Sequence, residues 1–259
     1  MKTIWIGAGL AFALALAGCG GGEKTEAPKP ADSASTAGGA AATPDLDNGA
    51  TITGKVVFDG AKPVAKTIDM SAVPACSNAH KTPAKSEEVV VNDNGTLKNA
   101  FVWVKSGLPD KTWQVPATPV ALTQSGCMYQ PHVIGAMAGQ NLDIKNADPT
   151  NHNIHPLPTA NSEWNESQPP GSPDKMQSFP RQEVLIPVKC NIHPWMRAYI
   201  GVVNHPFFAV TGDDGTFTIK GLPPGTYTIE VVHEKFGNSE QQITVGAKDS
   251  KTLDFTIKG

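Results

Sequence analysis

The hydrophobic residues of this chain fall in short runs that are rich in β-branched and aromatic side chains. Residues 52–58, 100–104 and 184–188 are three such runs, and Gly, Pro, Asn or Asp residues lie at or near their ends. Side chains of this kind pack well on a pleated, half-buried surface, so the runs predict β-strands. No segment keeps a helical period over a dozen residues. The chain from residue 51 onward is therefore predicted to be all-β, and its length of about two hundred residues suffices for two small domains.

The C-terminal part has its own pattern. Residues 209–219 predict a strand, a turn at Asp213-Asp214-Gly215 and a second strand, and Leu222-Pro223-Pro224-Gly225 then turns the chain into an alternating strand at 226–231. The two aspartates could suggest calcium binding. The further carboxylates of a calcium-binding loop are missing, however, so a β-turn is expected.

The run from Asp214 to Tyr227 resembles the D-G-x-F…L-P-P-G-x-Y hallmark of the carboxypeptidase-regulatory-like family. The resemblance implies a small transthyretin-like β-sandwich, whose usual first strand, G-x-V, is similar to residues 54–56. We therefore expect a discontinuous sandwich, with its first strands in 51–105 and its remainder in 207–259, around a second domain at 106–206. A plain tandem order of the two domains stays open as the alternative.

Residues 1–19 have the pattern of an export signal. Met1-Lys2 gives a positive start, and the apolar stretch 4–17 is too short for a stable membrane span. The stretch ends in Leu16-Ala17-Gly18-Cys19, which resembles a bacterial lipobox and implies a lipid anchor on Cys19 after cleavage. An ordinary secretory signal with an incidental cysteine is the alternative. Gly20 rather than Asp follows the cysteine, which favours the cell envelope at the periplasmic face of the outer membrane.

Composition separates a linker from the folded part. Residues 20–48 are rich in Gly, Ala, Pro, Ser and Thr. Such a segment buries too little apolar area to offset its ordering entropy, so a disordered linker is predicted. The whole chain carries a formal net charge of −3 with dispersed Lys and Arg, which does not favour binding to nucleic acid. No nucleophile elbow, P-loop or dinucleotide fingerprint appears.

The segment 188–197 carries the most specific chemistry. It places Cys190, His193 and Met196 at the spacing C-x2-H-x2-M. Two His, one Cys and a weakly held Met form the ligand set of a blue-copper site, because sulfur suits Cu(I) while imidazole holds Cu(II). The segment 151–155 offers the second imidazole through either of its two histidines.

The stretch from Cys127 to Val203 resembles the cupredoxins, and among them the amicyanin- and plastocyanin-like blue copper proteins. The family's His-Asn-x-His loop is similar to His152-Asn153-Ile154-His155, and its Cys-x-x-His-Pro-x-Met-Arg loop to residues 190–197. The resemblance implies a Greek-key sandwich that holds one type 1 copper per chain. Its implied ligands are His152, Cys190, His193 and Met196.

Other kinds of site fit these residues less well. A zinc site usually pairs C-x2-H with a second Cys or His at short spacing, and a haem attachment needs C-x-x-C-H. Met196 taken alone would be a core residue. His155 remains the rival of His152 and is otherwise expected to pack or hydrogen-bond nearby.

The neighbours of the ligands have expected roles as well. Asn153 is expected to tie the two ligand loops together and to bond near the cysteine sulfur. Ile192 stands where amicyanin has proline, so an additional N–H can point toward that sulfur. Pro194 and Trp195 directly follow His193. The resemblance implies that this histidine reaches the surface through which electrons are exchanged, and Trp195 is expected to belong to that surface. A core position for Trp195 is the alternative.

Two cysteines remain once Cys19 and Cys190 have their roles. Cys76 and Cys127 form an even pair in an oxidising compartment, so they are candidates for a disulfide, and a buried free thiol is the alternative.

A metal held by four protein ligands leaves no position open for a substrate, so an enzyme is not expected. The resemblance implies an electron carrier whose partners are c-type cytochromes or a periplasmic redox enzyme, with the lipid anchor holding it to the membrane. The alternative from another class is a copper-binding or carbohydrate- or protein-binding surface module without a role in electron transfer.

Overall fold

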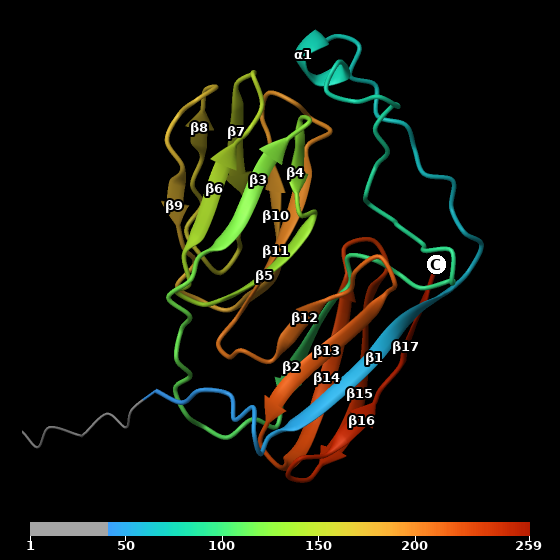
Figure 1. The fold of residues 1–259 in the computed structure, drawn as a ribbon, viewed down its shortest axis with the longest axis vertical. Coiled ribbons are helices and arrows are strands. Elements are labelled where there is room, and N and C mark those ends of the chain that lie inside the picture. Colours follow the sequence, from blue (N-terminus) through green and yellow to red (C-terminus); the bar gives the residue numbers. More distant parts are fainter. Residues whose placement is uncertain (1–40) are drawn as a thin grey trace, which may run out of the picture. The chain divides into compact units, whose positions relative to one another are not determined.

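The computed structural model describes residues 41–259 (Figure 1). One short helix, α1 (Pro74–Ser77), accompanies seventeen strands in this part of the chain. The strands are β1 (Ala50–Asp59), β2 (Phe101–Ser106), β3 (Val120–Ser125), β4 (Met128–Gln130), β5 (Val133–Met137), β6 (Leu142–Asn146), β7 (His152–Pro156), β8 (Glu166–Gln168), β9 (Lys175–Gln177), β10 (Glu183–Lys189), β11 (Arg197–Val203), β12 (Phe208–Val210), β13 (Thr216–Leu222), β14 (Gly225–His233), β15 (Gly237–Val245), β16 (Ser250–Thr252) and β17 (Phe255–Lys258). The predicted all-β class with two β-sandwiches is confirmed.

The first sandwich joins strands from both ends of the described chain. One of its sheets has the order β13-β1-β16, with β17 also paired to β1, and the other has the order β12-β2-β14-β15. β1 pairs antiparallel with β13 and parallel with β16 and β17. Between the sheets, Ile52, Val102, Phe217 and Ile229 are buried in one core. β1 and β2 thus share their sheets with strands β12 to β17.

The second sandwich is built from strands within residues 120–203. Its sheets have the orders β5-β11-β10-β7-β8 and β4-β3-β6-β9. β3 pairs with β6, and β5 with β11, in parallel, so crossovers rather than hairpins connect these pairs. Leu122, Ile144, Ile154 and Ile200 meet in its core. This sandwich holds the predicted metal ligands.

Two glycines allow close packing of aromatic rings on the second sandwich. Gly135 on β5 and Gly201 on β11 are partners across the strand pair. A Cβ on Gly201 would lie 2.4 Å from the ring of Phe101, and a Cβ on Gly135 would lie 2.4 Å from the ring of Phe208. The two rings come from β2 and β12 of the first sandwich and stack with centroids 5.8 Å apart. A larger side chain at either glycine would therefore have to displace a ring.

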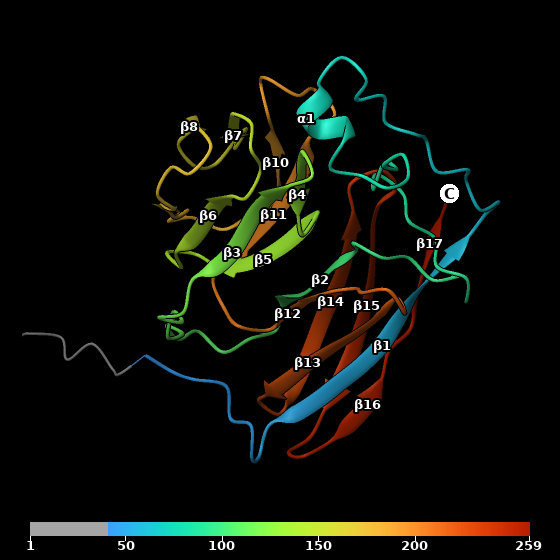
Figure 2. The ribbon, with the colours of Figure 1, turned by 45° about the horizontal axis from the view of Figure 1, so that its top comes forward.

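Between β1 and β2 the chain leaves the first sandwich. Ile68 N donates to Ala84 O at 2.9 Å, so the two ends of residues 68–84 lie together. Inside this segment Met70 and Cys76 are buried in the core of the second sandwich, and α1 lies near β4 (Figure 2). Residues 68–84 thus pack on the second sandwich, although they lie within the range 51–105 predicted to hold the first strands of the first sandwich, and a disulfide from Cys76 holds them there.

Residues 41–48, the described end of the predicted linker, make hydrogen bonds. Ala42 N donates to Thr112 O at 2.8 Å, and Gln114 N donates to Ala42 O at 2.7 Å. Asp45 Oδ1 accepts the N–H of Asn48 at 2.9 Å and shapes a turn. These bonds hold residues 42–48 in place at the end of the predicted linker.

The predicted signal peptide at residues 1–19, lipidation at Cys19 and most of the predicted linker lie outside the described residues. A search of the described residues for a helix both long and apolar enough to span a membrane finds none.

Candidate metal centre

The loop between β10 and β11 carries three of the predicted ligands. Lys189 and Arg197 pair across the strands that enter and leave it, and Cys190 N donates to Met196 O at 3.2 Å. Inside the loop, Met196 N donates to His193 O at 2.9 Å, and His193 N donates to Cys190 Sγ at 3.4 Å. These bonds hold Cys190, His193 and Met196 in one compact turn, where all three are buried.

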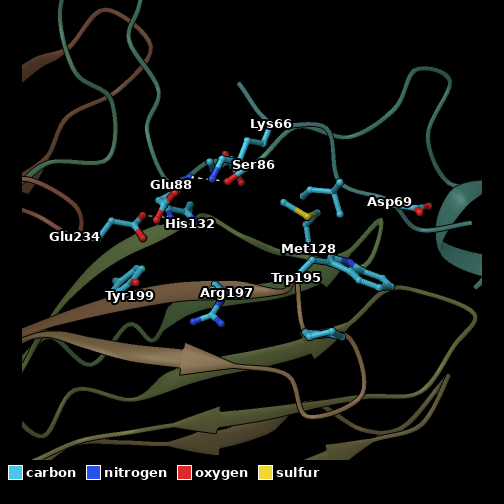
Figure 3. Close-up of a pocket in the computed structure, with 13 residues that line it drawn as sticks. Lys66, Asp69, Ser86, Glu88, Met128, His132, Trp195, Arg197, Tyr199 and Glu234 are labelled. Carbon is cyan, nitrogen blue, oxygen red and sulfur yellow. Dashed lines mark hydrogen bonds and ion pairs between the residues drawn. The ribbon is translucent and has the colours of Figure 1, made fainter. Parts of the chain in front are cut away.

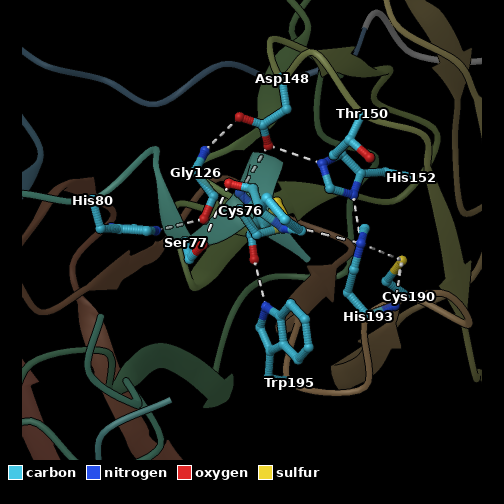
Figure 4. Close-up of a disulfide and its surroundings, with 12 residues drawn as sticks. Cys76, Ser77, His80, Gly126, Asp148, Thr150, His152, Cys190, His193 and Trp195 are labelled. Atoms are coloured by element: carbon cyan, nitrogen blue, oxygen red, sulfur yellow. Dashed lines mark hydrogen bonds and ion pairs between the residues drawn. A yellow bond between two sulfur atoms is a disulfide. The ribbon is translucent and has the colours of Figure 1, made fainter. Parts of the chain in front are cut away.

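Strand β7 supplies the second imidazole. It pairs with β10, where His155 lies opposite Lys189, and this pairing brings β7 to the ligand loop. His152 Nδ1 then lies 2.9 Å from His193 Nδ1, and Cys190 Sγ lies 3.9 Å from the same nitrogen of His193. One sulfur and two imidazole nitrogens thus converge within 4.8 Å of one another (Figure 4).

Burial and hydrogen bonds set the charges of these groups. His152 is 0% exposed, and Cys190 and His193 are each 2% exposed. Burial opposes ionisation of Cys190, but hydrogen bonds from His152 and from nearby backbone N–H groups hold the pKa of the thiol below its usual value. Burial likewise opposes charge on His152, yet Asp148 and Cys190 raise its pKa. Burial and the charge of His152 lower the pKa of His193. A thiolate and imidazole nitrogens in one buried cluster are a donor set that fits copper.

Asn153 connects the two ligand segments at the sulfur. Its Oδ1 accepts the N–H of Asn191 at 2.7 Å and lies 3.3 Å from Cys190 Sγ. Its Nδ2 donates to Asn165 Oδ1 at 2.6 Å, and Tyr129 Oη donates to its backbone carbonyl at 2.5 Å. The side chain of Asn153 therefore joins β7 to the ligand loop beside the sulfur.

Asp148 is a part of the site that sequence analysis missed. Its Oδ2 lies 2.8 Å from His152 Nε2, and its two oxygens also accept the backbone N–H groups of Gly126 at 2.7 Å and Cys127 at 2.8 Å. A ring that donates Nε2–H to a carboxylate keeps Nδ1 free to bind a metal. The only signal in the sequence was the turn Asn146-Ala147-Asp148-Pro149 just before the histidine segment.

A disulfide joins Cys76 and Cys127, the pair that sequence analysis proposed, with a Cα–Cα distance of 5.4 Å. Cys190 is a free, buried cysteine. Cys76 Sγ lies 3.7 Å from His193 Nε2, so the disulfide covers the outer edge of this imidazole (Figure 4). The expectation that His193 reaches the surface is therefore wrong, because a segment distant in the sequence packs over it.

The remaining residues singled out in the sequence lie around the cluster. Trp195 is partly buried, its ring centroid is 5.2 Å from that of His193, and its Nε1 donates to Cys127 O at 3.0 Å. Ile192 is 46% exposed, and Pro194 is exposed. Burial has the largest effect on the pKa of the Cys190 thiol and raises it. The backbone of Ile192 lowers this pKa, but less than the hydrogen bonds of His152, Asn153 and His193 do.

His155, the rival ligand, lies outside the cluster. Its Nδ1 is 3.1 Å from Asn191 Oδ1 and its Nε2 is 2.5 Å from Glu163 Oε1. Both ring nitrogens are therefore engaged away from Cys190.

A cavity of about 680 Å³ lies beside the ligand loop (Figure 3). Its wall combines apolar side chains with charged ones, among them Met128, Pro194, Trp195, Tyr199, Arg197, Lys66, Glu88, His132 and Glu234. His132 and Glu234 are paired with each other by a short hydrogen bond. Trp195 thus borders this cavity and also contacts the residues of the metal cluster.

Solved structures similar to part of this chain include copper proteins. One is the copper-containing nitrite reductase from Thermus scotoductus SA-01, which is 17% identical in sequence and gives a TM-score of 0.31. The similar region covers 38% of this chain and 25% of that chain. An oxidised amicyanin variant has 13% identity, covers 39% of this chain and 97% of that chain, and gives a TM-score of 0.30. A reduced Cu(I) form of another amicyanin variant has 16% identity, the same coverage and a TM-score of 0.28.

The profile of the carboxypeptidase regulatory-like domain family matches residues 194–258. This match contains β11 to β17, but not β1 and β2, which pair with its strands. No curated protein matches the chain. The chain is thus similar to the carboxypeptidase regulatory-like domain family over residues 194–258, and part of it is similar to the solved structures of the nitrite reductase and the amicyanin variants.

Proposed function

We propose that this protein is a blue (type 1) copper protein that carries single electrons between redox partners. The observation that supports the proposal is the convergence of Cys190 Sγ with the Nδ1 atoms of His152 and His193 in a buried pocket. Thiolate and imidazole together suit a metal that alternates between Cu(I) and Cu(II). Met196, buried in the same loop, is the proposed weak fourth ligand.

The chain's own residues prepare this site. Asp148 holds the ring of His152 through Nε2, which leaves Nδ1 for the metal. Asn153 and the N–H of His193 lie next to the Cys190 sulfur and orient it. Copper, when bound, supplies the one-electron redox step. Burial of the ligands excludes water and holds their geometry, which keeps reorganisation on electron transfer small.

We propose a carrier rather than an enzyme, because the four protein ligands leave no position on the metal for a substrate. The proposed partners are c-type cytochromes or a periplasmic redox enzyme. They would approach the face that carries Pro194 and Trp195, since Trp195 packs beside His193 and borders the cavity of Figure 3.

The proposal includes location and domain order. Removal of residues 1–19 and lipidation of Cys19 would tether the protein in the cell envelope, at the periplasmic face of the outer membrane. The copper-binding domain at 106–206 would be inserted into a sandwich made of 51–105 and 207–259, which the pairing of β1 with β13 and of β2 with β14 supports.

A second candidate is a copper-binding surface module without electron transfer, whose regulatory-like sandwich binds carbohydrate or protein. The observation that favours it is the position of His193, whose outer edge is covered by the Cys76–Cys127 disulfide. A closed metal site suits storage or a structural role as well as it suits electron transfer.

Visible absorption and electron paramagnetic resonance of the copper-loaded protein separate the two candidates. An electron carrier is expected to be intensely blue when oxidised, to bleach with ascorbate and to recover its colour on re-oxidation. A pale copper complex, or one that does not cycle, would contradict the proposed function and favour the second candidate.

A further inference from the structure

The two nitrogens of the His193 ring have different surroundings. Nδ1 faces His152 Nδ1 at 2.9 Å and Cys190 Sγ at 3.9 Å, on the metal side. Nε2 lies 3.7 Å from Cys76 Sγ, on the opposite side. Only 2% of His193 is exposed, so the disulfide and the segment around Cys76 take the place of solvent at its outer edge.

We propose that residues 68–84 form a cap over the outer edge of His193, and that the Cys76–Cys127 disulfide determines whether this edge is open or closed. That the cap controls the access of redox partners to the metal centre rests on the proposed function. The position of the cap itself does not depend on copper.

The cap has little regular structure of its own. Its only regular element is α1, which is four residues long. The hydrogen bond from Ile68 N to Ala84 O closes its base, and His80 Nε2 lies 2.7 Å from Gly126 O. Met70 is buried in the core of the second sandwich and Ile68, Val73 and Ala84 pack partly buried against it, whereas Ser71 and Ala72 are exposed. The other backbone hydrogen bonds within the segment are local and run from residues 73–80 to carbonyls three or four positions earlier, so they shape the segment without joining it to the second sandwich. The disulfide is its covalent link to that sandwich.

The other end of the disulfide is fixed to the metal centre. Cys127 N donates to Asp148 Oδ2 at 2.8 Å, and this carboxylate also holds His152. Cys127 O accepts the Nε1–H of Trp195 at 3.0 Å. Both backbone polar groups of Cys127 are thus bound by residues that contact the ligands. The disulfide therefore connects the segment 68–84 to a residue beside His193 whose backbone N–H and carbonyl are both hydrogen-bonded.

With the cap closed, the side of the His193 ring that faces Trp195 remains for electron exchange. The ring of Trp195 lies with its centroid 5.2 Å from that of His193 and borders the cavity in Figure 3. With the disulfide formed, electrons are directed past Trp195. With the disulfide broken, the Nε2 edge of His193 becomes a second and more direct point of exchange.

The test uses the full-length, copper-free protein and diethyl pyrocarbonate, with the modified histidines located by peptide mass spectrometry. The wild-type protein is compared with the double variant Cys76→Ser/Cys127→Ser. Modification of His193 is expected to be about tenfold faster or more in the double variant, because in the wild type it requires a rare local opening. Equal rates, or rapid modification of His193 in the disulfide-bonded protein, would overturn the proposal.

Two other histidines serve as internal controls. His205 is buried and bonded to Val104 O at 2.9 Å, so its continued protection shows that the variant is folded. His155 lies outside the cap, and its modification rate is expected to be the same in both proteins. The variant Ser77→Ala keeps the disulfide and is expected to leave His193 protected.

The wild-type protein offers a second measurement if the double variant does not fold. Dithiothreitol transfers two electrons and two protons to the disulfide and becomes a cyclic disulfide itself, which leaves Cys76 and Cys127 as two thiols in addition to Cys190, and alkylation counts them. Acceleration at His193 after this treatment, reversed on re-oxidation, supports the cap, and no acceleration overturns it. Because the readout is copper-free, a protein that never turns blue would refute the proposed function while leaving the result on the cap intact.

Discussion

His152 Nε2 lies 2.8 Å from Asp148 Oδ2, and the same carboxylate accepts the backbone N–H groups of Gly126 and Cys127. One side chain therefore fixes both the ring of a proposed ligand and the loop that carries the disulfide. Burial opposes its ionisation, but the hydrogen bonds from His152 and from the two backbone N–H groups lower the pKa of Asp148. The carboxylate is thus charged at neutral pH and orients the imidazole by a charge-assisted bond.

The substitution Asp148→Asn tests this relationship. The amide that it introduces is neutral and would hold the His152 ring less firmly, so the affinity for copper is expected to fall about 10- to 100-fold, the usual cost of losing such a partner. Competition with a chelator of known affinity measures the change. Asp143→Asn, on β6 and paired with Lys145, is the matched control and is expected to leave the affinity unchanged. Equal affinities of the wild type and the Asp148→Asn variant would show that the carboxylate does not orient the ligand.

The ligand assignment predicts distinct spectra for three variants. Cys190→Ser removes the thiolate and is expected to abolish the strong thiolate-to-copper absorption, and His152→Ala is expected to weaken it severely. His155→Ala is expected to leave it largely in place, because the two ring nitrogens of His155 face Asn191 and Glu163 instead of the cluster. Visible spectra of the copper-loaded variants give the answer. If His155→Ala bleaches the protein and His152→Ala does not, the first ligand is wrongly assigned.

The residues of the ligand loop could be predicted because their relation is local. Cys190, His193 and Met196 lie within one turn, and their spacing alone determines which donors meet. The first sandwich was likewise predictable from short motifs, since Gly54 in β1 and Phe217 in β13 belong to the family pattern and turn out to be paired residues.

The burial of His193 could not be predicted in this way. The contact that covers it joins residues 117 positions apart in the sequence, and residues 68–84 carry no pattern that assigns them to the second sandwich. Asp148 was missed for a related reason. A single Asp in a turn is common, and its role appears only when folding brings Gly126, Cys127 and His152 around it.

The N–H of Ile192 gives a prediction about the reduction potential. Hydrogen bonds to the cysteine sulfur stabilise the more electron-rich Cu(I) state, so they tune the potential. Ile192→Pro removes this N–H and is expected to lower the potential, as measured by redox titration of the blue absorption. Ile192→Ala retains the N–H and shortens a side chain that is 46% exposed, so its potential is expected to match the wild type. A rise or no change in the proline variant would show that this N–H does not act on the sulfur.

The disulfide predicts a loss of stability when it is removed. Cys76 and Cys127 are 51 positions apart, and a loop of this size is worth roughly 4 kcal/mol in the chain-entropy model. Cys76→Ser/Cys127→Ser is expected to lower the free energy of unfolding by up to that amount in urea denaturation. Non-reducing peptide mapping of the wild type is expected to find Cys76 joined to Cys127, with Cys190 free when copper is absent. Recovery of Cys127 as a free thiol from exported protein would refute the bridge.

His205 predicts how stability depends on pH. It is 7% exposed, its Nε2 donates to Val104 O at 2.9 Å, and its Nδ1 accepts the N–H of Phe207 at 3.2 Å. Burial lowers its pKa from 6.5 to about 4, although the bond to Val104 opposes the shift. A second proton, on Nδ1, would point at the backbone N–H of Phe207, which Nδ1 accepts in the neutral ring. The folded state therefore binds this proton weakly.

The sign follows from proton binding. Between pH 6.5 and about 4 the unfolded chain binds a proton at residue 205 that the folded protein does not, so the free energy of unfolding falls as the pH falls through this window. The full effect is up to about 3 kcal/mol. His205→Gln has no such proton to bind, and its stability is expected to change less over the same window. Urea denaturation of both proteins at a series of pH values gives the difference between their free energies of unfolding. Titrating groups that the two proteins share do not contribute to this difference. Parallel pH profiles would show that His205 is not kept neutral by the fold.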